Sequence, residues 1–104
     1  MADWTQLLVL QFPGASIGDF DRLVALEGVL EKSLGPAAAV DGHDFGSGEG
    51  NIFIFANDAA VVFRDVLSRL DDRARTDLRA AWRDVEGEDF KILWPSTLKT
   101  FRVL

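Results

Sequence analysis

Residues 4–12 read WTQLLVLQF, and the centre of this segment decides the fold class. A strand turns alternate side chains to opposite faces, so the consecutive apolar residues 7–10 predict a central strand covered on both sides. Pro13 and Gly14 end that strand. Residues 51–56, NIFIFA, have the same two-faced apolar character and predict a second central strand.

Helical patterns follow each of these strands. Residues 16–34 place apolar side chains at three- and four-residue intervals, with Ser16 as a good N-cap. Gly35 and Pro36 are a standard helix stop. After the second strand, Asn57-Asp58 caps another apolar helical pattern, which we expect to end near Arg75.

Further strands complete the pattern. Residues 37–45 predict a weak edge strand, and residues 90–94 predict a strand that Pro95 closes. Residues 78–85 fit both strand alternation and helical spacing. We favour the strand, because 86–89 (EGED) resemble a hairpin turn before the next strand. The tail, 96–104, is a candidate for a short final strand.

The predicted order is therefore β-α-β-β-α-β with extra strand material at the C-terminus. That order is the ferredoxin-like plan, an α+β sandwich with an antiparallel sheet. Its first and third strands lie in the sheet centre, which is where the two-faced apolar segments fall. Residues 1–104 show no linker or repeat, so we predict a single domain.

Composition narrows the classes of function. The chain has no cysteine, which excludes disulfides, thiolate zinc sites and thiol nucleophiles. Its net charge of −6 disfavours nucleic acid and anionic membranes as partners. We find no signal peptide and no apolar run long enough to span a membrane, so a cytoplasmic location is expected.

The glycine-rich segment 41–51, DGHDFGSGEGN, is the first candidate for a functional site. It brings together carboxylates, the only histidine, a hydroxyl and an amide, with no cation among them. The candidate ligand- or partner-binding residues are Asp41, His43, Asp44, Ser47, Glu49 and Asn51.

Three readings of this segment stay open. Its oxygen ligands could hold a divalent cation, although the spacing is not that of an EF-hand and we assign no metal and no cofactor. His43 and Asp44 are weak candidates for general acid–base catalysis, with Asp41 on the same strand face as His43. The plainest reading is a hairpin with a polar, solvated tip.

Two surfaces bear on partners. Acidic residues interleave with a series of arginines at 64, 69, 73, 75, 79 and 83. The four-residue spacings Asp65–Arg69 and Asp71–Arg75 indicate a salt-bridged surface rather than a site for an acidic partner.

The second surface is the sheet face away from the helices. Two helices cover only one face of a sheet, so the other apolar face needs cover. Either the C-terminal strands supply it or two chains pack as a homodimer, which we expect.

The run 40–55, VDGHDFGSGEGNIFIF, together with Trp82-Arg83-Asp84 and the segment 91–95, KILWP, resembles a family of small uncharacterised bacterial proteins. Their shared feature is an Asp-Gly-x-Asp-x-Gly-Ser-Gly-Glu hairpin. The resemblance implies a strand-rich C-terminus and carries no activity or catalytic residue to this chain.

Two hypotheses of function remain from the sequence. The first is a non-enzymatic binding or protein-interaction module, of immunity or accessory type, whose acidic surface suits a basic protein partner. The second is a small enzyme, or a metal- or ligand-binding protein, that uses the hairpin residues His43, Asp41, Asp44 and Glu49. The fold hosts both kinds of protein.

Overall fold

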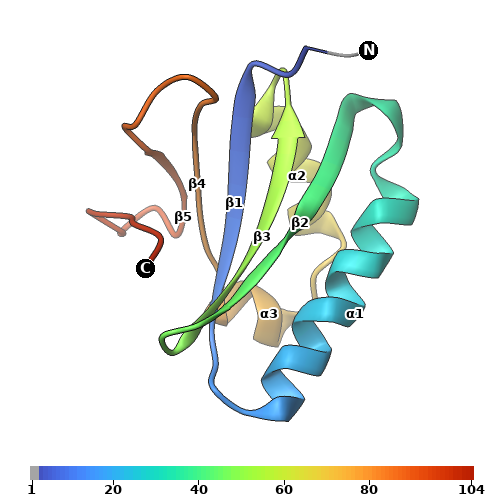
Figure 1. Cartoon of the computed structure of the whole chain (residues 1–104), viewed down its shortest axis with the longest axis vertical. Coiled ribbons are helices and arrows are strands. Elements are labelled where there is room, and N and C mark those ends of the chain that lie inside the picture. Colours follow the sequence, from blue (N-terminus) through green and yellow to red (C-terminus); the bar gives the residue numbers. More distant parts are fainter. Residues whose placement is uncertain (1–2) are drawn as a thin grey trace.

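The computed structural model describes residues 3–104 (Figure 1). Its strands and helices alternate as the sequence predicts, with one short helix added before β4. The elements in chain order are β1 (Gln6–Pro13), α1 (Ile17–Ser33), a 3-10 turn (Gly35–Ala37), β2 (Ala38–Gly46), β3 (Glu49–Ala56), α2 (Ala59–Ser68), α3 (Asp72–Asp77), β4 (Arg79–Asp84) and β5 (Lys91–Trp94).

The strands form one antiparallel sheet in the order β2-β3-β1-β4-β5. The first four strands have the ferredoxin-like order, with β1 and β3 side by side in the centre, and β5 extends the sheet beyond β4. The fold class predicted from the sequence is confirmed. The strand prediction for 78–85 is also confirmed, since β4 occupies that segment.

The main core lies between the sheet and the helices. Leu8 and Leu10 of β1 and Ile52 and Ile54 of β3 have no exposed surface and face this layer, where Leu30 of α1 is equally buried. In Figure 1 the helices lie on one side of the sheet and the C-terminal segment, in red, lies on the side away from α1.

The chain itself covers the opposite face of the sheet. Leu7 and Val9 of β1 are buried there, and the carbonyl of Arg102 in the tail accepts a hydrogen bond of 2.9 Å from Gln11 Nε2. The tail forms no strand, so that suggestion from the sequence is wrong, but it does provide cover. The argument for a homodimer across this face no longer holds, and the homodimer stays a prediction.

The second helical segment is not continuous, contrary to the prediction of one helix from Asp58 to near Arg75. It breaks at Arg69, and Asp71 caps the new helix α3 by accepting a 2.8 Å hydrogen bond from the Ala74 N–H. Asp71 is therefore a cap rather than an ion-pair partner, and Arg75 Nε donates to the Leu67 carbonyl at 3.0 Å. The Asp65–Arg69 pair does form, at 3.2 Å.

Candidate functional site

The hairpin residues predicted as a site do not converge. β2 pairs with β3 through a bulge between Val40 and Gly42, which breaks the strand alternation next to Asp41. His43 lies opposite Ile52 and so faces the helices, whereas Asp44 lies opposite Asn51 on the other face. Asp41 lies at the bulge, outside the paired register, so its sharing a face with His43 stays a prediction.

His43 does have a carboxylate partner, but it comes from α1. Its Nδ1 lies 2.9 Å from Glu27 Oε1, and the ring makes an edge contact with Phe20. Glu27 is only 9 % exposed. The sequence offered a signal for it, because Glu27 occupies the same helix face as the buried Leu23 and Leu30, at four and three residues' distance.

Glu49 and Asn51 are brought together on the opposite face of the sheet. Gln11 Nε2 donates to Glu49 Oε2 and to Asn51 Oδ1, each at 3.0 Å, and Asn51 Nδ2 donates to Glu49 at 3.1 Å. Ser47 sits apart, in the turn between β2 and β3, where it and Gly48 both have positive φ as a type I′ hairpin requires.

Within residues 3–104, no three histidine, aspartate or glutamate side chains are placed together to hold a metal ion. Over the same residues, no helix is long and apolar enough to cross a membrane.

A cleft of about 590 Å³ lies between α1 and the α2–α3 corner, above the end of the sheet. It exists because α2 stops at Ser68, so the second helical layer leaves the end of the sheet partly bare. Glycines and alanines are among the residues that line this cleft. Its lining comprises Phe12, Pro13, Gly14, Asp19, Arg22, Leu23, Ala25, Leu26, Phe45, Gly50, Arg69, Leu70, Asp71, Arg73, Ala74 and Asp77.

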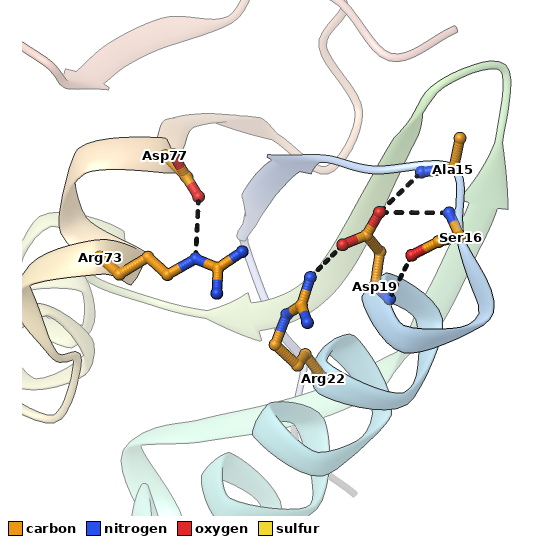
Figure 2. A network of polar contacts seen from close by, with 6 residues as sticks. All are labelled: Ala15, Ser16, Asp19, Arg22, Arg73 and Asp77. Carbon is orange, nitrogen blue, oxygen red and sulfur yellow. Dashed lines mark hydrogen bonds and ion pairs between the residues drawn. The ribbon is translucent and has the colours of Figure 1, made fainter.

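The cleft combines an apolar floor with a charged rim. Leu23 and Leu70, which are buried, and Phe45, which is half-buried, belong to the floor or pack against the core beneath it. Arg22 and Arg73 stand on opposite walls, with side chains that are 57% and 73% exposed. Figure 2 shows the two guanidinium groups extending toward one another from α1 and α3.

Each of these arginines has an aspartate as a partner. Asp19 contacts Arg22 Nη2, and Asp77 Oδ2 lies 4.0 Å from Arg73 Nε, as Figure 2 shows. A guanidinium has five N–H donors, and these contacts use few of them. N–H donors therefore remain free on both walls, and an anion placed between the two guanidinium groups could accept hydrogen bonds from them.

Asp19 is fixed in its role by the start of α1. Its Oδ2 accepts hydrogen bonds from the backbone N–H groups of Ser16 and Ala15 at 3.1 and 3.0 Å, while the Ser16 hydroxyl accepts from the Asp19 N–H. The bonds from Ser16 and Ala15, with Arg22 adding to them, lower the pKa of Asp19 below its usual value of 3.8. Asp19 thus stays ionised and orients Arg22.

This lowered pKa predicts how the helix cap responds to acid. A carboxylate whose pKa is depressed by folding stabilises the fold above its unfolded pKa, and that contribution is lost as pH falls through the folded pKa. Asp19→Asn should therefore lower the melting temperature at pH 7, and the difference from the unmodified chain should shrink below a pH of about 4. Thermal unfolding followed by circular dichroism measures it, and a difference that is independent of pH would contradict the assignment.

Comparison with protein-family models, with curated proteins and with solved structures finds no match for the chain. The resemblance to a bacterial hairpin family therefore stays a prediction.

Proposed function

We propose that the protein is a non-enzymatic binding module that takes a small organic anion with an apolar body in the cleft between α1 and α3. The observation that carries this proposal is the pair of facing arginines, Arg22 and Arg73, above an apolar floor. The volume of about 590 Å³ falls within the range of small-molecule sites.

The chemistry of the lining matches such a ligand. Arginine presents a planar fork of donors that fits a carboxylate, and charge-assisted hydrogen bonds are stronger than neutral ones. The floor around Leu26 and Phe45 would bury the apolar body of the ligand. Both arginines are exposed in these pairs, and surface ion pairs contribute only about 0–1 kcal/mol, so a ligand can compete for the guanidinium groups.

Binding rather than catalysis fits the groups present. His43 lies outside the lining of the cleft, and its Nδ1 is paired with Glu27 on the buried face of α1. The aspartates in the cleft serve as helix cap residues or as arginine partners. The homodimer, the protein partner and the cytoplasmic location remain predictions from the sequence, and light scattering at micromolar concentration tests the first of them.

Blocking the mouth of the cleft tests the proposal. Ala25 is an exposed alanine of α1 that lines the cleft, so Ala25→Trp should fill the entrance without disturbing the core. We expect the unmodified chain to bind decanoate one to one with Kd on the order of 10–100 μM by calorimetry. Binding to Ala25→Trp should be at least about tenfold weaker.

Ala60→Trp is the matched control, because Ala60 is an exposed alanine of α2 that does not line the cleft. It should bind decanoate as the unmodified chain does. Equal weakening by both substitutions, or no binding to the unmodified chain by any of a series of apolar carboxylates, would refute the proposed function.

A further inference from the structure

A buried polar cluster lies in the centre of the sheet, on the face away from the helices. Gln11 of β1 is 2 % exposed, and Glu49 and Asn51 of β3 are 6 % and 0 % exposed. The next positions along the two strands on this face, Val9 and Phe53, are apolar, whereas Arg79 and Asp44 lie across from Gln11 and Asn51 on the adjacent strands. A hydrogen-bonded set of an amide, a carboxylate and a second amide is thus buried on this face.

The cluster binds the backbone of the C-terminal tail. Gln11 Nε2 donates to the Arg102 carbonyl at 2.9 Å, and the Leu104 N–H donates to Glu49 Oε2 at 3.2 Å. The contacts are to the main chain, so they do not depend on the side chains of Arg102 and Leu104, which are exposed. The cluster thus hydrogen-bonds the carbonyl of one residue and the N–H of the second residue after it, and in an extended peptide these two groups point to the same side.

The side chains of the tail alternate in the same manner. Phe101 and Val103 are half-buried, whereas Arg102 and Leu104 point to solvent. Phe101 packs its ring edge-on against Phe90 with centroids 4.9 Å apart. The tail therefore lies on the sheet as an extended segment with apolar residues at every second position, although it adds no strand to the sheet.

The need to cover this face of the sheet with the tail does not explain why the cluster is polar. A buried carboxylate loses hydration, and no arginine or lysine lies within ion-pair distance of Glu49 in the described residues, so apolar side chains would cover the sheet at less cost. The tail also leaves a cavity of about 280 Å³ beside it, lined by Gln11, Glu49, Arg79 and tail residues 100–102 and 104. The tail fits this site incompletely.

We propose that Gln11, Glu49 and Asn51 form a peptide-binding site, occupied in the free chain by its own tail, that takes an extended peptide of another protein. The recognised peptide has apolar residues at alternate positions, presents a carbonyl to Gln11 and an N–H to Glu49, and displaces residues 99–104. This site lies on the opposite face of the sheet from the anion cleft, so the two proposals are tested independently.

Loosening the tail in the full-length chain tests this site. Phe101→Ala removes the contact with Phe90 while the sheet keeps all its binding groups. The probe is a labelled peptide of residues 99–104, KTFRVL, with both ends blocked, followed by fluorescence polarisation. A tethered tail competes at an effective millimolar concentration, so Phe101→Ala should bind the peptide at least about tenfold more tightly than the unmodified chain.

Two controls distinguish recognition of the peptide backbone from non-specific binding. The exposed Arg102 offers only its carbonyl to the site, so the chain variant Arg102→Ala should bind the peptide as the unmodified chain does. A peptide methylated on the nitrogen of its last leucine lacks the donor to Glu49 and should bind Phe101→Ala about tenfold more weakly. Equal binding of the methylated peptide, no binding to Phe101→Ala, or dimers that exchange tails without added peptide would overturn the proposal.

Discussion

Gly50→Val is expected to lower the free energy of unfolding by about 1–3 kcal/mol, because a side chain there would displace the packed side chains of Leu23 and Phe45. A Cβ atom at Gly50 would lie 2.8 Å from Leu23 Cδ2 and 3.1 Å from Phe45 Cδ1. Strands otherwise favour valine over glycine by up to about 1 kcal/mol. If the space around Gly50 were open, the substitution would therefore raise the free energy of unfolding. Thermal unfolding should show a fall of about 5–20 °C in the melting temperature.

Gly46→Val is the matched control on the neighbouring strand. Gly46 is exposed and nothing lies within 4 Å of a Cβ atom placed there, so this variant should be neutral or slightly more stable. The double variant Gly50→Val with Leu23→Ala should cost less than the sum of the two single variants, because the truncated leucine vacates the space that valine needs. Strict additivity, or a stable Gly50→Val, would contradict the close approach of α1 to β3.

Replacing both facing arginines should have the largest effect on ligand binding. In the variant Arg22→Gln/Arg73→Gln the apolar floor is intact, but the cations that would meet the carboxylate are gone. We expect the affinity for decanoate to fall by about 10–100-fold, which corresponds to about 1.4–2.8 kcal/mol. Affinity for decanol, which has no charge, should change little.

Arg64→Gln removes an exposed arginine of α2 outside the cleft and is the control for net charge. It should leave decanoate binding almost unchanged, since exposed charges at a distance are screened by salt. If Arg64→Gln weakens decanoate binding as much as the double variant does, the effect is one of overall charge and the assignment of Arg22 and Arg73 is wrong.

The sheet was predictable from the sequence because its signals are local. Four consecutive apolar residues in β1 and the apolar run of β3 mark strands buried on both faces, and both strands lie in the centre. The weak, polar character of β2 placed it correctly at an edge. Glycine and proline residues, such as Pro13, Gly35 and Pro95, marked where predicted strands and helices end.

The cleft was not predictable, because its walls come from segments far apart in the chain. Nothing in the local pattern around Arg22 marks it as facing Arg73, about fifty residues away. The break between α2 and α3, which opens the cleft, depends on Asp71 capping a new helix instead of pairing with Arg75. The carboxylate partner of His43 likewise comes from a distant segment, since Glu27 lies on α1 and not on the hairpin.

The most direct test of the central claim is to follow the backbone amide resonances of the labelled chain by NMR during a titration with decanoate. Saturable shifts should cluster at Leu26, Phe45, Gly50 and Ala74 and at the two facing arginines, with the tail residues 99–104 undisturbed. Shifts that are absent, or that gather around His43 and the hairpin turn instead of the cleft, would contradict it.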